Sequence, residues 1–196
     1  MPWAWVPLVG IAVFFAVGLW WRPWLHQRRY GSSGLFMFRS GRRSQDVRDA
    51  LALVLILALV VQAAVSPSLI SSPAWRVLGL LLLLGGIILL VVGQLALGAS
   101  WRVGIEEGAK PGLVTDGIYR WSRNPIFLAF LAAVAGYAVL LPTPLSFLLW
   151  AAFYAGVRAQ IRSEEEYLLR TYGEAFRAYA RGVGRLILGV GRYRGS

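Results

Sequence analysis

The sequence predicts an all-α fold, a polytopic membrane helix bundle formed by a single domain that covers residues 1–196. First, 58% of the residues are hydrophobic and only 15% are charged, and the mean hydropathy is +0.61. This balance is typical of membrane proteins. Second, five apolar segments recur along the chain. Third, the chain has no cysteine and one histidine, His26. Disulfides and cysteine metal sites are therefore excluded, and we expect no metal site.

The five apolar segments are each long enough, or nearly so, to cross a hydrocarbon core of about 30 Å. They are Trp3–Trp21, a stretch from near Ala50 past Val65, Val77–Ala99, Ile126–Leu141, and Pro144 to about Val157. The last two are short and are joined by "LPTP", whose prolines stop one helix and start the next. We therefore expect about five transmembrane helices, the last two forming a tight hairpin.

Glycine recurs every seven residues on the third segment, at Gly79, Gly86 and Gly93. These residues would share one face of a helix and let a neighbouring backbone approach closely. A glycine-rich phosphate-binding loop is the alternative interpretation of "LLGGIILLVVG". It needs a preceding strand, which a bilayer does not allow here, so helix packing is favoured.

The charged residues are distributed unevenly between the two ends of the expected helices. The net charge is +11, and six arginines with no acidic residue lie between Arg22 and Arg43. Only Arg76 falls on the opposite side. The positive-inside rule therefore predicts an external N-terminus and a cytoplasmic C-terminus. Since the basic residues flank apolar segments, we expect a bilayer with anionic lipids as the partner and no nucleic acid.

Two long polar segments would then share the cytoplasmic face with the loop from Arg22 to Asp49. Residues 100–125 are rich in glycine and proline, which predicts a turn-rich loop. A plain connecting loop is one interpretation, but long loops in small proteins are usually functional or disordered. The tail after Val157 predicts an amphipathic helix, whose apolar stripe comprises Ile161, Leu168, Tyr172, Phe176, Tyr179 and Val183.

Three consecutive glutamates differ in their place on this tail helix. Glu165 lies near the middle of the apolar stripe and Glu164 on its flank, whereas Glu166 points away and is expected to be solvated. A carboxylate on an apolar face at a membrane boundary is costly without a cationic or hydrogen-bonding partner. That partner is either an arginine of the cytoplasmic segments or a positively charged ligand.

At this point the sequence resembles a known family. "LVTDGIYRWSRNPIF" is similar to the "LVTxGxYxxxRHPxY" signature of isoprenylcysteine carboxyl methyltransferases, and "EEYLLRTYGEAFRAYARGVGR" to their closing "EExxLxxxFGxxYxxYxxxVxR". "SWRVGI" looks like the lead-in of bacterial members, which favours a prokaryotic inner membrane. The resemblance covers residues 100–185 and implies a catalytic half, with residues 1–99 as a three-span scaffold half.

The resemblance implies an integral membrane enzyme that binds S-adenosylmethionine without a Rossmann domain. The cofactor-binding positions that it implies are Leu113, Val114, Tyr119, Arg123, Asn124, Pro125 and Glu164, with Asn124 in place of the signature histidine and Phe127 in place of its tyrosine. We expect Arg123 to hold the methionine carboxylate and Glu164 the ammonium, by charge-assisted hydrogen bonds. Helical phase places Glu165 more centrally than Glu164, so both stay candidates for the cofactor contact.

Further roles are expected for four residues. If the acceptor is an amine, Glu165 could serve as the base once burial raises its pKa. Arg102 is a second catalytic candidate. The family's substrate-contacting arginine corresponds to Gln160 here, so we expect Gln160 and the nearby Arg158 to contact the substrate.

The predicted function is methyl transfer from S-adenosylmethionine to a lipophilic acceptor, leaving S-adenosylhomocysteine. The nucleophile is a carboxylate, an amine or a thiol of a lipid or isoprenoid-like molecule. Alternatives are a phospholipid N-methyltransferase, a membrane NADPH-dependent sterol-type reductase, and a non-enzymatic small transporter or structural protein.

Overall fold

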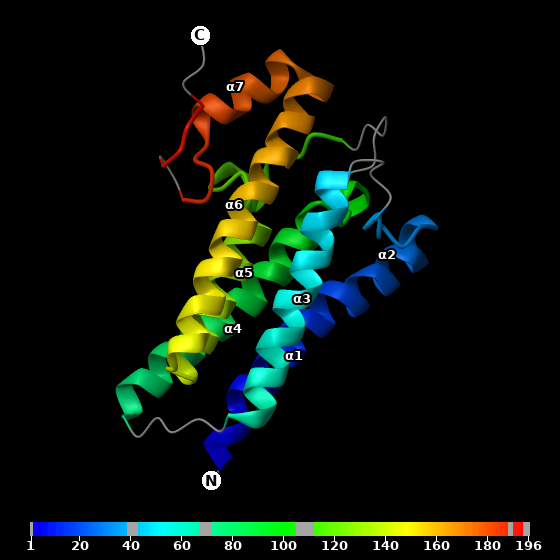
Figure 1. The fold of residues 1–196 in the computed structure, drawn as a ribbon. Helices are drawn as coiled ribbons and strands as arrows, with labels where there is room; N and C mark the ends of the chain where they lie inside the picture. Colours follow the sequence, from blue (N-terminus) through cyan, green and yellow to red (C-terminus); the bar gives the residue numbers. More distant parts are fainter. Residues whose placement is uncertain (1, 39–42, 67–71, 105–111, 188–189, 194–196) are drawn as a thin grey trace.

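The computed structural model describes residues 2–38, 43–66, 72–104, 112–187 and 190–193. Its elements form an elongated helical bundle with the two termini at opposite ends (Figure 1). They are η1 (Pro2–Trp5), α1 (Val6–Ala16), the π-helical turn η2 (Val17–Trp21), α2 (Arg22–Tyr30), α3 (Arg43–Val65), α4 (Pro73–Ala96), η3 (Gly98–Ser100), η4 (Gly117–Arg120), α5 (Pro125–Leu140), α6 (Pro144–Tyr172) and α7 (Glu174–Gly182). The described residues contain no strand, only an isolated bridge between Leu35 and Val103.

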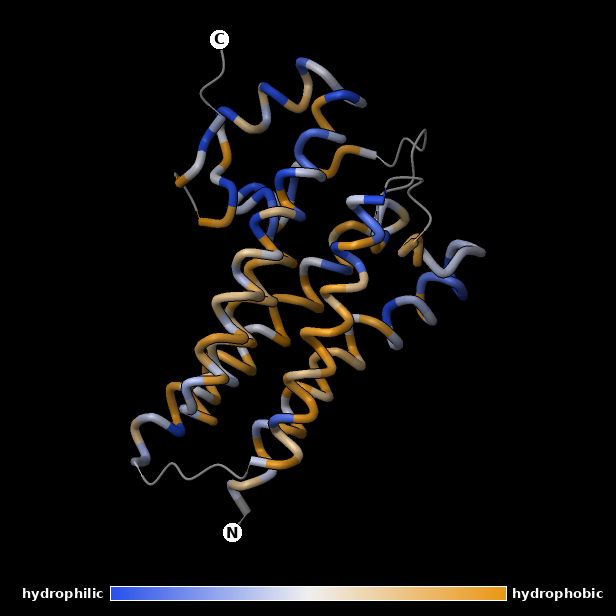
Figure 2. Tube along the Cα trace, in the orientation of Figure 1, coloured by the Kyte–Doolittle hydropathy of each residue, from blue (hydrophilic) through white to orange (hydrophobic). Residues whose placement is uncertain are grey.

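The predicted all-α membrane bundle is confirmed. Three helices are long and apolar enough to cross a membrane, namely Trp3–Tyr30, Arg43–Val65 and Pro73–Ala96, and α5 is a shorter apolar helix. Apolar residues fill the middle of the bundle, and polar residues gather at the end that carries α7 and the C-terminus (Figure 2). Both α5 and the apolar first part of α6 pack beside these helices, as the predicted hairpin requires.

Two boundaries differ from the prediction. The expected loop from Arg22 to Asp49 is helical over α2 and from Arg43 onward. The fifth apolar segment and the start of the tail are one 29-residue helix, α6. No glycine or proline interrupts the chain between Gly156 and Gly173. The helix ends at Gly173, whose positive φ of 52° belongs to the left-handed region. The predicted single tail helix is therefore two helices, α6 and α7.

The glycine face of α4 packs against α5, as predicted. A Cβ built on Gly86 would lie 2.8 Å from the Ala133 nitrogen, and one on Gly136 would lie 2.6 Å from the Leu83 nitrogen. Real Cβ atoms do not approach backbone so closely, so only glycine allows the two helix backbones to come this near. This contact fixes α5, and with it the polar segment that precedes it.

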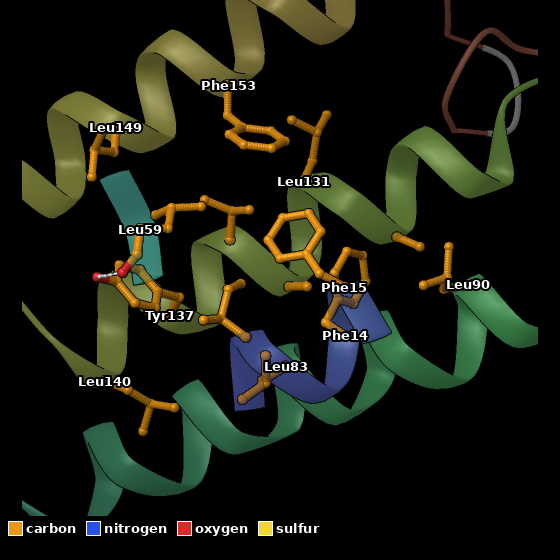
Figure 3. Close-up of a cluster of buried hydrophobic side chains, with 14 of the residues drawn as sticks. Phe14, Phe15, Leu59, Leu83, Leu90, Leu131, Tyr137, Leu140, Leu149 and Phe153 are labelled. Atoms are coloured by element: carbon orange, nitrogen blue, oxygen red, sulfur yellow. Dashed lines mark hydrogen bonds between the residues drawn. The ribbon is translucent and has the colours of Figure 1, made fainter. Parts of the chain in front are cut away.

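The apolar core joins the two ends of the chain. Phe14 and Phe15 of α1 lie beside Leu131 of α5 and Phe153 of α6 (Figure 3). The Tyr137 hydroxyl donates to the Leu59 carbonyl of α3, at 3.0 Å. These contacts hold α1, α3, α5 and α6 together. A cavity lies near the polar ends of α3 and α6.

Candidate functional site

A cavity of about 350 Å³ lies between the polar ends of α3 and α6, residues 100–104 and residues 112–124. Its apolar wall comes from η2, α3, α5 and α6 and includes Leu19, Ile56, Phe130 and Phe153. The predicted site residues that line it are Arg102, Leu113, Val114, Tyr119, Arg123, Asn124, Gln160, Glu164 and Glu165. One cavity thus combines charged groups with a surface suited to a hydrocarbon chain.

Glu164 is a titratable group within the cavity, on the polar extension of α6. Its Oε1 accepts a hydrogen bond from Gln160 Nε2 at 3.0 Å. The pKa of Glu164 is raised to about 7, mainly by burial and also by the charges of Glu165 and Asp49, while the Gln160 hydrogen bond and the charge of Arg102 act in the opposite direction. A buried carboxylate of this kind gains from a cationic ligand, which would remove the cost of ionising it.

Glu165 is neutralised by two arginines. Its Oε1 lies 2.8 Å from Arg123 Nη2, and its Oε2 lies 2.6 Å from Arg185 Nη2. Arg185 Nε also donates to Oε2, at 2.9 Å. Since both oxygens already accept hydrogen bonds from guanidinium groups, the arrangement does not favour the predicted role of Glu165 as a base.

Arg123 uses all five of its N–H groups within the protein. Nε and Nη2 donate to Glu165 Oε1, Nη1 donates to the Ala180 and Val183 carbonyls, and Nη2 donates to the Gly191 carbonyl. The expectation that Arg123 grips a cofactor carboxylate conflicts with this geometry, because no N–H is left for a second carboxylate. The sequence could not predict these acceptors, since three of them are backbone carbonyls.

Asn124 also bonds to the segment that follows α7. Its Nδ2 donates to the Arg185 carbonyl at 2.9 Å, and the Arg123 nitrogen donates to the Gly184 carbonyl at 3.0 Å. Together with Glu165, these residues hold the segment after α7 against α6. The signature segment before α5 therefore locks the C-terminal segment beside the cavity.

The remaining loop residues meet the expectations unevenly. The Tyr119 hydroxyl donates to the Gly93 carbonyl at 3.3 Å, and Tyr179 donates to the Tyr119 carbonyl at 2.7 Å, which ties the loop to α4 and α7. Pro125 is buried at the first position of α5 and does not line the cavity. Residues 105–111 of the predicted cofactor loop lie outside the described residues.

The two residues predicted to contact the substrate, Gln160 and Arg158, lie on different faces of α6. Gln160 lines the cavity, whereas Arg158 does not. Arg158 donates to the exposed Tyr154 hydroxyl at 3.1 Å, one turn earlier on α6. Positions 158 and 160 are about 200° apart around an α-helix, which places Arg158 away from this cavity, and its contact with a substrate stays a prediction. Arg102 lines the cavity with its guanidinium 5.4 Å from the centre of the Tyr167 ring.

Sequence reasoning missed three polar residues of α3 that belong to this region. Gln45 Nε2 donates to Asp49 Oδ1 at 2.8 Å and to Gln160 Oε1 at 3.2 Å. Arg48 Nη2 donates to Gln45 Oε1 at 2.7 Å. Arg48 and Asp49 line the cavity. Their spacing of three and four residues, at the polar start of a helix that is mostly apolar from Ala50 onward, was the signal that could have found them.

The fold and the cavity define the class of protein. It is a membrane helix bundle with a cavity that is lined by charged side chains at one end and by apolar side chains along its wall. The family described as phospholipid methyltransferase matches residues 74–175, from α4 into α7. The chain belongs to this family.

The relatives that match the chain share one name. "Protein-S-isoprenylcysteine O-methyltransferase" of Saccharomyces cerevisiae is 38% identical over 77 residues, 37% of this chain and 30% of that protein. The protein of the same name from Dictyostelium discoideum is 27% identical over 128 residues, 63% of this chain and 53% of that protein. The chain thus spans between 30% and 53% of the length of these relatives.

A solved structure shares the fold. It is that of a eukaryotic intramembrane Ras methyltransferase, isoprenylcysteine carboxyl methyltransferase, with a TM-score of 0.66 and 21% sequence identity. The match covers 94% of this chain and 66% of that one. At this identity the likeness shows the fold alone, and it extends over α1 and α3 as well as the part that the family model matches.

Proposed function

We propose that this protein transfers a methyl group from S-adenosylmethionine to a carboxylate carried by a lipophilic molecule. The observation that carries the proposal is the place of Glu164, a half-buried carboxylate with a raised pKa in a cavity whose other wall is apolar. A zwitterionic, positively charged methyl donor and a lipid acceptor would meet in such a cavity. Family membership and the names of the relatives support the same reaction class.

The residues present fit this cofactor. Glu164 would bind the ammonium of its methionine part, because that charge satisfies a carboxylate which burial leaves costly to ionise. Arg102 lines the same cavity, and its charge acts on Glu164, so we assign it, instead of Arg123, to the methionine carboxylate. Leu113, Val114 and Tyr119 would pack against the adenosine part. When bound, S-adenosylmethionine supplies a methyl group activated by a sulfonium.

The protein's own contribution is alignment and exclusion of water. The apolar wall would hold the acceptor chain and leave its head group beside Glu164. Glu165, Arg123 and Arg185 would keep the C-terminal segment closed over this end. A carboxylate nucleophile needs no base, which agrees with a Glu165 whose two oxygens are occupied by Arg123 and Arg185. An amine acceptor would require one.

We propose further that residues 1–196 act as one domain, with residues 100–185 supplying the cofactor contacts and α3 of the first half supplying part of the cavity. The arginine distribution supports a cytoplasmic C-terminus, so the cofactor would enter from the cytoplasm and the acceptor from the bilayer. The relatives are eukaryotic, so they lend no support to a prokaryotic inner membrane.

The test uses the full chain in lipid nanodiscs with S-[methyl-³H]adenosylmethionine. N-acetyl-S-farnesylcysteine presents a carboxylate, and phosphatidylethanolamine presents an amine. We expect base-labile label, the property of a methyl ester, in the first lipid. Base-stable label in the second lipid would show that the methyl acceptor is an amine instead of a carboxylate. No transfer to either lipid, together with no binding of S-adenosylhomocysteine, would refute the function.

A further inference from the structure

The described lining of the cavity contains three arginines, and they differ in what their donors do. Arg123 directs all five N–H groups to protein oxygens. Arg102 lies over the Tyr167 ring and within the field of Glu164. Arg48 is different: its Nε is buried and has no hydrogen-bond partner among the described residues. Its side chain nevertheless lines the cavity, and the one hydrogen bond of its guanidinium to a described residue is the one to Gln45, so this cation can pair with an anionic ligand in the cavity.

Gln45 fixes the position of Arg48 relative to the cofactor end. The side chain of Gln45 is almost fully buried. Its Oε1 accepts from Arg48 Nη2, and its Nε2 donates to Gln160 Oε1. Gln160 in turn donates to Glu164 Oε1. One hydrogen-bonded chain therefore runs from Arg48 on α3 to Glu164 on α6. Arg48 is thus held at the same polar end of the cavity as Glu164, the side chain proposed to bind the cofactor's ammonium.

The neighbouring carboxylate does not occupy the free donor of Arg48. Asp49 Oδ1 accepts from Gln45 Nε2 at 2.8 Å, and its Oδ2 accepts from the Phe38 nitrogen at 3.0 Å. Beyond Arg48 the lining turns apolar along the same helix, with Leu51, Ala52, Leu55 and Ile56. These positions follow Arg48 by three, four, seven and eight residues, the spacing of one helix face. The helix thus presents a cation followed by a strip of hydrocarbon.

We propose that Arg48 binds the oxyanion of the acceptor's head group while the acceptor's chain lies along α3. The inference rests on the proposed function, because calling the ligand an acceptor means that it receives the methyl group. The chemistry it names is an anionic amphiphile, whose anion is either a carboxylate or a phosphodiester. Arg48 would then be a specificity-determining residue, because an acceptor without the anion would leave the positive charge of its guanidinium without a partner in the cavity.

The test measures binding without turnover, so that it does not depend on methyl transfer. Purified full-length protein with bound S-adenosylhomocysteine is titrated with two matched pairs of amphiphiles. One pair is N-acetyl-S-farnesylcysteine and its carboxamide; the other is lysophosphatidylglycerol, which carries an anionic phosphodiester and no amine, and monoacylglycerol. The variants are Arg48→Gln, Arg48→Lys and the control Arg43→Gln, which removes an exposed arginine at the start of the same helix.

We expect the wild type to bind one anionic probe at least tenfold more tightly than its neutral partner. The pair that shows this preference identifies the anion as carboxylate or phosphodiester. Arg48→Gln should abolish the preference and leave binding of the neutral partner within about twofold. Arg48→Lys should retain part of it, and Arg43→Gln should retain all of it. If Arg48→Gln fails to fold, the lysine variant decides, because a reduced preference at an unchanged fold requires the guanidinium.

Two results would overturn the inference: no preference for either anionic probe in the wild type, or an equal preference in wild type and Arg48→Gln. Failure of the proposed function looks different. An Arg48-dependent preference in a protein that neither transfers a methyl group nor binds S-adenosylhomocysteine would refute the methyltransferase proposal and leave the anion site standing.

Discussion

The raised pKa of Glu164 makes the proposed cofactor contact dependent on pH in a direction that the structure fixes. Burial raises this pKa from 4.5 to about 7 in the free protein. If the ionised carboxylate binds the cofactor ammonium, a proton on Glu164 competes with that ammonium. Lowering the pH from 7 to 5.5 reduces the ionised fraction from about one half to about 3%. The affinity for S-adenosylhomocysteine should therefore fall roughly tenfold over this interval, because the ammonium itself stays protonated throughout.

Isothermal titration of the purified full chain measures this dependence. At pH 7, repeating the titration in buffers of different ionisation enthalpy should also reveal the release of about half a proton on binding. Glu164→Gln should bind weakly with a flat profile, since loss of a charge-assisted hydrogen bond costs about 1.5–3 kcal/mol. Glu166→Gln is the matched control, exposed and two residues away, and should follow the wild type. In the wild type and in Glu166→Gln, the charges of Arg102, Asp49 and Glu165 act on Glu164 alike.

A flat profile in the wild type between pH 7 and 5.5 would refute the reasoning, because a Glu164 with an ordinary pKa of 4.5 would stay ionised there. The same pKa has a consequence for stability. A carboxyl whose pKa rises on folding stabilises the fold below its unfolded pKa, and this contribution is lost as pH rises through about 7. The free wild type should therefore lose about 3 kcal/mol between pH 4.5 and pH 8 that Glu164→Gln does not lose.

Three further predictions concern the fold. Arg123→Lys should lower the unfolding temperature and expose the C-terminal segment to protease, because an ammonium has three donors and cannot reproduce the five N–H contacts; unchanged proteolysis would mean that these bonds do not hold the segment. Gly86→Ala should destabilise the protein in thermal unfolding, since its Cβ would meet α5 at 2.8 Å, whereas Gly85→Ala, which faces open space, should be neutral or stabilising by up to about 1 kcal/mol; equal effects would contradict the close packing. Reporter fusions after Leu141 and at the C-terminus should indicate the outside and the cytoplasm respectively, and the reverse pattern would overturn the proposed orientation.

The sequence by itself determined the environment and the coarse architecture. Hydropathy is a sum over neighbouring residues, so the apolar segments that became α1, α3, α4 and α5 could be predicted within a few residues. The glycine spacing on α4 also predicted its packing face, because helical periodicity is local. The motif around Arg123, through its family resemblance, predicted that residues 100–125 and the glutamates of the tail helix would lie at one site.

The tertiary structure alone decided what each charged side chain does. Glu164 and Glu165 are adjacent in sequence, yet one lies in the cavity beside Gln160 and the other between Arg123 and Arg185. Their partners come from 4 to 42 residues away, and one of them, Arg123, is itself held by backbone carbonyls, which no residue pattern encodes. Arg48 could not be assigned to the site either, because α3 and α6 meet only after folding. The reason is physical: apolar burial depends on local composition, whereas a buried charge depends on whichever donor or acceptor the packing of distant helices brings within about 3 Å.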